Sequence, residues 1–323
     1  MKSYNWGIVG TGWIAHEMGE ALHKLHHKIY GVCDISLEKA QNYANEFQVS
    51  HAFASMQDML EDEQLDIVYV ATPHNLHYEC IRAALQQGKH VFCEKVITVN
   101  EAQLREVKQL AKEKQLILME GMTLYHMPLF KEVKHRINQG EIGSVKLVQV
   151  NFGSCKEYDV NNRFFSSELA GGALLDIGTY ALSLVRWFLH EQPDTILTSM
   201  LPFETGVDEM SGIILRNSLD EMATVTLTMR AKLPKRGIIA GEDGYLEISE
   251  YPRANSFEIR YTKDGWTETI DAGVRGDALL YEVRDMEAVV SGAAENHTLQ
   301  ISSDVVSLMD EIRRQWGMKY PFE

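Results

Sequence analysis

The sequence Gly10-Thr11-Gly12-Trp13-Ile14-Ala15 follows the short apolar segment Trp6–Val9 and precedes an amphipathic stretch. It matches the pattern GxGxxA, in which glycines allow a tight turn and a close approach of the backbone to a pyrophosphate at a helix N-terminus. Because the pattern lies between a predicted strand and a predicted helix, it indicates a dinucleotide-binding βαβ unit. The alternative is a glycine turn beside a helix-capping aspartate.

A second apolar segment, Ile29–Cys33, is followed directly by Asp34, which lies 22 residues after Gly12. A carboxylate at this position can accept hydrogen bonds from the adenosine ribose hydroxyls, which favours NAD over NADP. NADP remains an alternative cofactor, since the ammonium group of Lys39 could reach its 2'-phosphate. We therefore expect NAD, with NADP possible.

Up to about Gly121, short apolar runs alternate with amphipathic stretches, as in a parallel sheet covered by helices on both faces. The other predicted strands of this half are Ile67–Ala71, His90–Cys93 and Leu116–Met119. The pattern predicts an α/β fold, with a doubly wound Rossmann domain for dinucleotide binding over residues 1–121.

Residues 122–323 have a different hydrophobic pattern, in which apolar and polar residues alternate and so favour antiparallel strands. The predicted strands are Val145–Phe152, Ala223–Arg230, Arg236–Ala240, Tyr245–Ser249, Phe257–Tyr261 and Thr267–Ile270. Helices are predicted near Pro128–Asn138, Leu279–Ser291 and Ser302–Trp316. We expect an α+β domain for substrate binding and dimerisation, with a large open, mostly antiparallel sheet. Its exposed face predicts a homodimer or a dimer of dimers.

The chain carries 31 Lys and Arg against 46 Asp and Glu, a formal net charge of −15, which disfavours nucleic acids and anionic membrane surfaces as partners. Its four cysteines form no CxxC pair, and neither an export signal nor an apolar run of about 18 residues is apparent. These features predict a cytoplasmic protein with a small-molecule partner.

The segment Thr72-Pro73-His74-Asn75-Leu76-His77 follows the predicted strand Ile67–Ala71. Ligands of open α/β sheets gather at the carboxyl ends of strands, so we expect this segment to flank the cofactor. Helix capping or surface exposure is the alternative for His74 and His77. They have no third ligand nearby, so we predict no metal site.

Glu94 and Lys95 follow the predicted strand His90–Cys93. A lysine near a bound nicotinamide can hold a substrate hydroxyl or assist its deprotonation. The alternative is a solvated ion pair. The predicted cofactor-binding residues are Gly10, Thr11, Gly12, Trp13, Ile14, Asp34, Thr72, Pro73, His74, His77, Glu94 and Lys95.

Asp176 and Tyr180 lie four residues apart in the run from Gly171 to Tyr180 and would share one face at the start of a helix. A tyrosine becomes a useful acid or base for alcohol chemistry when an ammonium group lies beside it, and a carboxylate can orient that ammonium group. The alternative is a helix-capping aspartate and a half-buried tyrosine.

Taken in order, Gly10-Gly12-Ala15, Glu94-Lys95, the Gly140-Ile142-Gly143 turn and Asp176-Gly178-Tyr180 resemble the glucose-fructose oxidoreductase/inositol dehydrogenase (Gfo/Idh/MocA) family across the whole chain. The resemblance implies a Rossmann domain, an α+β domain whose open sheet mediates dimerisation, and hydride transfer with a nicotinamide cofactor. It assigns Lys95, Asp176 and Tyr180 as catalytic residues. Within the family, Tyr180 and the preceding Arg163-Phe164-Phe165 resemble the residues of the branch that contains dihydrodiol and xylose dehydrogenases.

Two positions depart from the family pattern. Val96 stands where the family usually has proline after the Glu-Lys pair. The stretch Thr123–Pro128 lacks the arginine and tryptophan seen nearby in the dihydrodiol branch, so the resemblance does not identify the substrate.

These observations predict an NAD(P)-dependent oxidoreductase that transfers hydride between a nicotinamide and a carbinol or carbonyl carbon of a sugar, polyol or diol. Tyr180 would handle the hydroxyl proton, Lys95 would lower the tyrosine pKa and hold the substrate oxygen, and Asp176 would orient Lys95. Tyr125 and Arg163 are weaker substrate-binding candidates that could equally be packing or rim residues. The alternatives are a non-catalytic cofactor-sensing regulator on the same fold and an NAD-dependent glycoside hydrolase.

Overall fold

The computed structural model describes residues 4–323, and the chain forms two compact units. The first unit contains the chain up to Met122 together with Asp277–Gln300, and the second contains Thr123–Gly276 and Ile301–Glu323. The sequence-based division assigned helix α9 (Ala278–Val290) to the second domain, whereas it groups with the first. The reason lies in contacts made by Glu287 on α9, whose carboxylate accepts a 3.0 Å hydrogen bond from Trp6 Nε1 and lies 3.1 Å from His27 Nε2.

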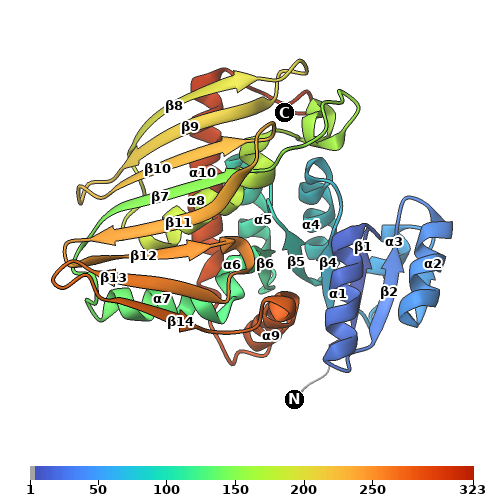
Figure 1. Cartoon of the computed structure of the whole chain (residues 1–323). Coiled ribbons are helices and arrows are strands. Elements are labelled where there is room, and N and C mark those ends of the chain that lie inside the picture. The colour runs from blue at the N-terminus through green and yellow to red at the C-terminus, as the bar shows by residue number, and fades with distance from the viewer. Residues whose placement is uncertain (1–3) are drawn as a thin grey trace. The chain divides into compact units, whose positions relative to one another are not determined.

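The first unit is built on six parallel strands in the order β3-β2-β1-β4-β5-β6, which confirms the predicted doubly wound Rossmann fold (Figure 1). The strands β1, β2, β4 and β6 are buried at every position, as expected for a sheet covered on both faces. The strands are β1 (Trp6–Val9), β2 (Ile29–Cys33), β3 (His51–Phe53), β4 (Ile67–Val70), β5 (His90–Glu94) and β6 (Leu118–Gly121).

The helices of the first unit begin at residues with the expected capping chemistry. Ser36, Ser55 and Asn100 each accept a hydrogen bond from the backbone N–H three residues further on, at the starts of α2, α3 and α5. The helices that precede α9 are α1 (Trp13–Lys24), α2 (Leu37–Phe47), α3 (Met56–Leu60), the 3₁₀ turn η1 (His74–Leu76), α4 (His77–Gln86) and α5 (Glu101–Glu113).

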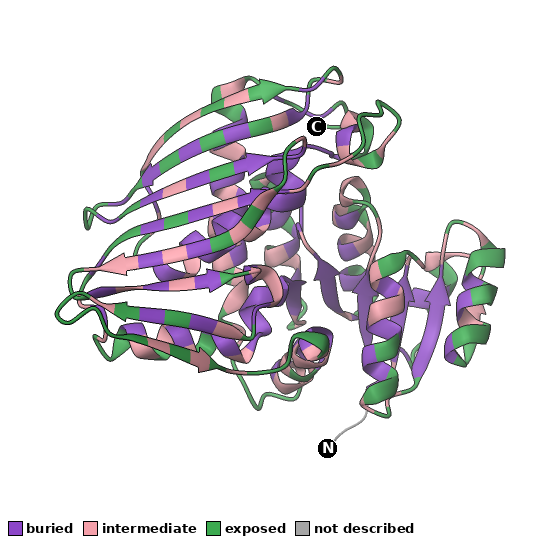
Figure 2. Ribbon diagram, viewed as in Figure 1, coloured by how far each residue is buried: buried purple, intermediate pink, exposed green. Residues whose placement is uncertain are grey.

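The second unit contains eight strands in the order β14-β13-β12-β11-β7-β10-β9-β8. Only β7 and β10 pair in parallel, so the prediction of a mostly antiparallel sheet is confirmed. Figure 2 shows buried and exposed residues alternating along its strands, because one face is covered by helices and the other is open. The strands are β7 (Val145–Gly153), β8 (Thr195–Pro202), β9 (Asp208–Arg216), β10 (Met222–Thr228), β11 (Leu233–Gly241), β12 (Gly244–Ser249), β13 (Ser256–Tyr261) and β14 (Thr267–Asp271).

Helix α8 (Thr179–Phe188) packs against β7, β10 and β11 and is largely buried. A short π-helix, η4 (Leu174–Gly178), leads into it. The other helical segments of this unit are α6 (Thr123–His126), α7 (Pro128–Asn138), η2 (Arg163–Phe165), η3 (Ser167–Leu169), η5 (Tyr251–Arg253) and α10 (Thr298–Trp316), and η6 (Arg275–Asp277) and the first turn of α10 lie at the unit boundaries.

The helical stretch Ser167–Phe188 is long and apolar enough, by length and composition, to cross a membrane. Within the second unit, however, 83% of its most apolar window is buried. Burial of this kind is what the core helix of a folded domain shows, because its apolar side chains are already covered by protein.

Candidate active site

The turn after β1 has the geometry that the glycine pattern predicts. Gly10 has φ of +91°, and a Cβ atom there would lie 2.8 Å from the carbonyl oxygen of Ala71. Gly12 caps the N-terminus of α1, and a Cβ atom on it would meet nothing within 4 Å. The backbone amides of the first turn of α1 have no intrahelical acceptors, so this open space beside them suits the pyrophosphate of a dinucleotide.

Asp34 is fastened to this turn. Its Oδ2 accepts hydrogen bonds from Thr11 N at 2.9 Å and from Thr11 Oγ1 at 2.8 Å, and its Oδ1 accepts one from Ser36 N at 3.1 Å. These donors hold the carboxylate at the end of β2 in one orientation. The predicted cofactor-binding residues Thr11 and Asp34 are therefore brought together, while Trp13 is 72% exposed beside them in the sequence.

The segment after β4 forms η1, with Pro73 before it, and then α4. His77 is fully buried, and its Nδ1 lies 2.8 Å from the carbonyl oxygen of Val96 and its Nε2 2.9 Å from that of Thr72. Burial lowers the pKa of His77, although both carbonyl oxygens work in the opposite direction. His77 thus joins the segment after β4 to the segment after β5, and His74 packs edge-on against its ring at 5.7 Å.

Lys95 is half-buried directly after β5, and the peptide bond between Lys95 and Val96 is cis. The following residue, Ile97, donates its backbone N–H to Glu120 Oε1 at 2.9 Å. Together with the contact between His77 and Val96, this bond fixes the backbone on the carboxyl side of Lys95.

Glu94 points into the interior of the first unit. Tyr69 Oη donates a hydrogen bond to its Oε1, and a Cβ atom on Gly121 would lie 3.4 Å from Glu94 Oε1 and 3.6 Å from Glu282 Oε2. Burial, with the neighbouring Glu282 carboxyl, raises the pKa of Glu94 to about 8. Glu94 therefore forms a buried acidic pair with Glu282 and accepts a hydrogen bond from Tyr69, and sequence reasoning missed both neighbours.

In the second unit, Asp176 and Tyr180 lie at the junction of two helix types. Asp176 is on the π-helix η4 and is buried, whereas Tyr180 is the second residue of α8 and is half-buried. The ring of Tyr180 lies 6.1 Å from that of Phe152, which in turn packs edge-on against Tyr251 at 5.9 Å. The aromatic residues supply a partly apolar surround for the Tyr180 side chain.

The two weaker substrate candidates lie in different surroundings. Tyr125 is buried, its hydroxyl donates to Ser183 Oγ at 2.8 Å, and its ring stacks on Trp187 at 5.3 Å. Arg163 is exposed, and its guanidinium lies over the Phe164 ring at 4.3 Å. The structure therefore places Tyr125 in the packing of the second unit and Arg163 at its surface.

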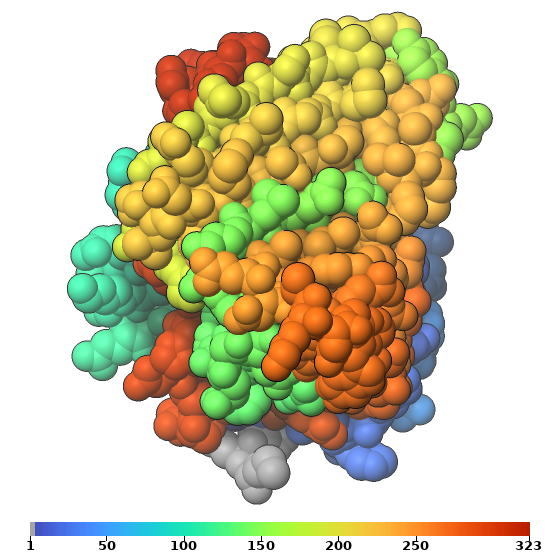
Figure 3. All heavy atoms as spheres, turned by 60° about the vertical axis from the view of Figure 1, so that its left-hand side comes forward, coloured from blue at the N-terminus to red at the C-terminus, as the bar shows by residue number. Residues whose placement is uncertain are grey.

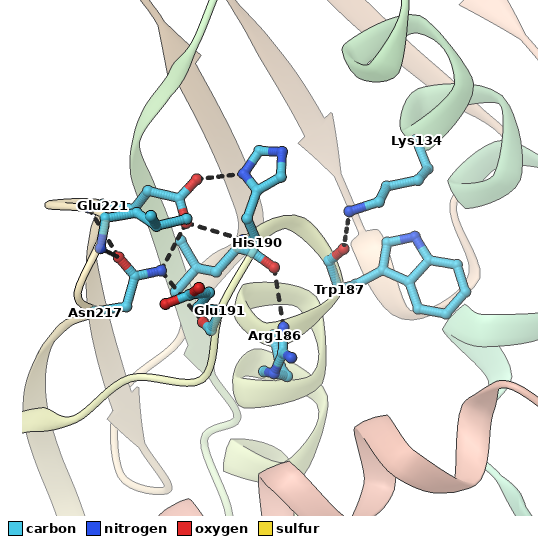
Figure 4. Close-up of polar contacts among 9 residues, drawn as sticks. Lys134, Arg186, Trp187, His190, Glu191, Asn217 and Glu221 are labelled. Carbon is cyan, nitrogen blue, oxygen red and sulfur yellow. Dashed lines mark hydrogen bonds and ion pairs between the residues drawn. The ribbon is translucent and has the colours of Figure 1, made fainter.

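The end of α8 is held by polar contacts at several carbonyl groups (Figure 4). Lys134 Nζ donates to the carbonyl of Trp187 at 2.8 Å, and Arg186 donates to that of Leu189 at 2.9 Å. Beyond the helix, Glu221 accepts a 2.9 Å hydrogen bond from His190 N and a 2.6 Å bond from Asn217 Nδ2. These contacts satisfy groups that a helix terminus leaves open, so α8 is a fixed support for Tyr180.

The described residues contain no group of three or more His, Cys, Asp or Glu side chains placed to hold a metal ion. Two buried polar residues near the candidate residues, Glu282 and Asp208, carry no sequence motif. Their burial arises from tertiary contacts, and a single sequence offers no signal for them. Ser36, which donates its backbone N–H to Asp34, could have been found from the capping preference of serine at a helix N-terminus.

A Rossmann unit with a glycine turn and a fixed aspartate, joined to an α+β unit with a large sheet, defines a dinucleotide-dependent oxidoreductase. The family model described as "Oxidoreductase family, NAD-binding Rossmann fold" matches residues 4–122, and that of the "GFO/IDH/MocA C-terminal domain" matches residues 130–247. The chain belongs to the Gfo/Idh/MocA oxidoreductase family, as the resemblance predicted.

Curated relatives match the chain over nearly its whole length. The trans-1,2-dihydrobenzene-1,2-diol dehydrogenase of Xenopus laevis is 32% identical over 98% of this chain and 99% of its own. The D-xylose 1-dehydrogenase (NADP(+)) of Hypocrea jecorina is 31% identical over 98% of this chain and 93% of its own. A solved levoglucosan dehydrogenase, in complex with NADH and levoglucosan, shares the fold with a TM-score of 0.88 at 19% identity, over 99% of this chain and 100% of its own.

Proposed function

We propose that this enzyme transfers hydride between a nicotinamide cofactor and a carbinol or carbonyl carbon of a sugar, polyol or diol. The observation that carries the proposal is that relatives spanning 98% of the chain are named dehydrogenases of a dihydrodiol and of D-xylose. Both names denote oxidation at a carbon that bears a hydroxyl group.

The residues of the first unit fit a dinucleotide. The open space at Gly12 and the amide groups of α1 suit a pyrophosphate, and Asp34 can accept bonds from ribose hydroxyls. The exposed apolar side chains of Trp13, Ile35 and Leu76 follow the carboxyl ends of β1, β2 and β4, where an aromatic base and a nicotinamide ring need cover. The fixed carboxylate of Asp34 supports a preference for NAD, because it would repel a 2'-phosphate.

The bound nicotinamide would supply the acceptor or donor carbon for hydride. In our proposal Tyr180 exchanges a proton with the substrate hydroxyl, Lys95 holds the substrate oxygen and lowers the tyrosine pKa, and Asp176 orients Lys95. The fixed backbone beside Lys95 in the first unit and the polar contacts at the end of α8 in the second unit favour these roles. Arg163 remains a candidate for binding substrate, since its side chain is exposed.

We also propose that the open face of the large sheet forms a homodimer (Figure 3). Exposed apolar side chains lie in register on neighbouring strands of this face: Leu197 opposite Ile214, Leu201 opposite Met210, and Leu147 opposite Met222. Exposed apolar side chains of this kind are stabilised in water when a self-complementary contact covers them. The four cysteines are free thiols, which supports a cytoplasmic location, where thiols stay reduced.

The test of the function is a panel of sugars, polyols, inositols and diols with NAD and with NADP at several pH values. Absorbance of the reduced nicotinamide measures turnover, and we expect steady-state reduction with at least one member. If the protein binds cofactor but turns over no member in either direction, the oxidoreductase assignment fails and a cofactor-sensing role takes its place. Substrate cleavage without net cofactor reduction would indicate glycoside hydrolysis instead.

A further inference from the structure

Asp208, the first residue of β9, is fully buried at the N-terminal end of η4. Its Oδ2 accepts a 2.9 Å hydrogen bond from the backbone N–H of Leu174, the first residue of that π-helix. Asp176 lies two residues further on, and Tyr180 lies in the first turn of α8, which continues from η4. One buried carboxyl group thus holds the start of the helical segment that carries both proposed catalytic residues of this unit.

The turn before η4 is shaped around the same carboxyl group. Gly172 has φ of +110°, and a Cβ atom there would lie 2.4 Å from Asp208 Oδ1. Its neighbour Gly171 accepts a 2.7 Å hydrogen bond from the hydroxyl of Tyr320. The backbone N–H of Gly172 in turn donates to the carbonyl of Phe164 at 2.9 Å. Residues 171–174 are therefore held from three directions, and no side chain larger than hydrogen fits at position 172.

We infer that Asp208 is a positioning residue for the reaction, which fixes the N-terminus of η4 and thereby the orientation of Asp176 and Tyr180. The inference rests on the proposed roles of those two residues. An isosteric neutral side chain can replace Asp208, because the contact to Leu174 requires an oxygen acceptor and no charge.

The protonation of Asp208 agrees with this requirement. Burial raises its pKa to about 8, against the opposing effects of the backbone N–H groups of Leu174, Asp208 and Ala173 and of the Arg313 guanidinium. The phenol of Tyr320 also faces it, and Arg313 is itself paired with Asp310 and Glu323. Asp208 is therefore mostly neutral at pH 7, and asparagine matches both its shape and its charge.

The experiment compares Asp208→Asn with Asp208→Ala at pH 7. With the most active panel substrate, we expect Asp208→Ala to lower kcat by about 10- to 100-fold, since small displacements of reacting groups have effects of this size. Asp208→Asn should stay within about twofold of the wild type, because it keeps the acceptor. NADH binding, followed by protein fluorescence, should be unchanged in both variants. Asp271→Ala, at an exposed position on β14, is the matched control and should leave kcat unaltered.

Hydrogen exchange gives a readout that needs no substrate. Asp208→Ala should speed exchange in peptides covering residues 171–180, and Asp208→Asn should not. Asp208→Ser is a second variant for the case in which Asp208→Ala fails to fold: its hydroxyl is too short to reach the backbone N–H of Leu174 but keeps a polar group at the buried position, and it should reproduce both effects. A wild-type kcat in Asp208→Ala, or an Asp208→Asn variant as impaired as Asp208→Ala, would overturn the inference. If the wild type turns over no substrate, the proposed function fails, whereas the exchange experiment still decides whether Asp208 holds this segment.

Discussion

At the scale of single residues, the proposed chemistry depends on a hydroxyl group that Tyr180→Phe removes. Because general acid–base catalysis contributes about a hundred- to ten-thousand-fold in rate, we expect kcat to fall by that factor while circular dichroism and NADH affinity stay native. Lys95→Met should have a similar effect on kcat and weaken substrate binding further. The double variant should be little worse than the worse single one, since residues that act as a unit are non-additive. Near-native kcat in a folded Tyr180→Phe protein would remove Tyr180 from the mechanism.

Asp34 controls the choice of cofactor in our proposal. Asp34→Ala removes the acceptor for the ribose hydroxyls and the charge that repels a 2'-phosphate, so the ratio of NADP affinity to NAD affinity should rise. Titration of both cofactors measures this ratio. The assignment fails if the native protein binds NADP more tightly than NAD, or if the ratio does not change. A loss of Thr11 contacts alone would weaken both cofactors equally.

Glu94 gives the first unit a pH-dependent stability. The unfolded chain releases this proton near the usual carboxyl pKa of 4.5, whereas the folded protein retains it up to about pH 8. Stability from this group is therefore complete below pH 4.5 and declines as the pH rises through the interval to 8. Glu94→Gln keeps an acceptor for Tyr69 and removes the titration.

Between pH 5 and pH 8 we expect the wild type to lose more unfolding free energy than Glu94→Gln, by on the order of 1 kcal/mol or more. Urea denaturation at both pH values measures the difference. Glu38→Gln, at an exposed position in the first turn of α2, is the control. Equal losses of unfolding free energy in the wild type and in Glu94→Gln would contradict the prediction that the folded protein retains the Glu94 proton above pH 5.

The predictability of these residues follows from how local their signals are. A sequence pattern indicates Gly10, Gly12 and Asp34, because backbone conformation and position at strand ends are local properties. His77 was expected beside the cofactor, but its bonds to the carbonyls of Thr72 and Val96 could not be anticipated. The burial of Glu282 and Asp208 depends on segments distant in sequence, which no local pattern reports.

At the scale of secondary-structure elements, the polar contacts after α8 should stabilise the fold. Glu221 accepts bonds from His190 and Asn217, and although burial works to raise its pKa, these bonds outweigh it and lower the pKa. Glu221→Ala should lower the unfolding free energy by about 1–3 kcal/mol, because the partners lose their acceptor.

Thermal denaturation at pH 7 measures this effect. The stabilisation by Glu221 is present above the usual carboxyl pKa and declines as the pH falls through the lowered one, so the wild type and Glu221→Ala should converge in acid. Glu209→Ala, with a half-buried glutamate side chain on β9, is the comparison, and the prediction is wrong if both substitutions have equal effects.

The strands β3, β8 and β9 were missed by sequence reasoning for two physical reasons. Strand β3 has three residues at the edge of its sheet, none of them fully buried, so it lacks the apolar run of its neighbours. Strands β8 and β9 place Leu197, Leu201, Met210 and Ile214 on the exposed face, which obscures the alternation of apolar and polar residues. The same apolar residues that hid the strands mark the proposed dimer face.

At the scale of the whole molecule, the proposed dimer makes a prediction about mass. Ile214→Glu, with Leu197→Glu on the neighbouring strand, places two charges within the proposed contact, where burial without a partner is unfavourable. Sedimentation velocity at micromolar concentration should show a dimer for the wild type and a monomer for this variant. Leu219→Glu, at a 53% exposed turn between β9 and β10, is the control and should remain dimeric. A wild type that sediments only as a monomer would contradict the proposal.

The return of residues 277–300 to the first unit has a consequence for the order of events during synthesis. The ribosome completes the six strands of the Rossmann sheet by Gly121, yet Glu287, the partner of Trp6 and His27, emerges only when most of the chain has been made. At about 5–20 residues per second, the nascent first unit waits roughly 8 to 33 seconds for this helix. During that interval most of the second unit is being made, so the N-terminal unit of this enzyme begins first but is completed only when nearly the whole chain has been synthesised.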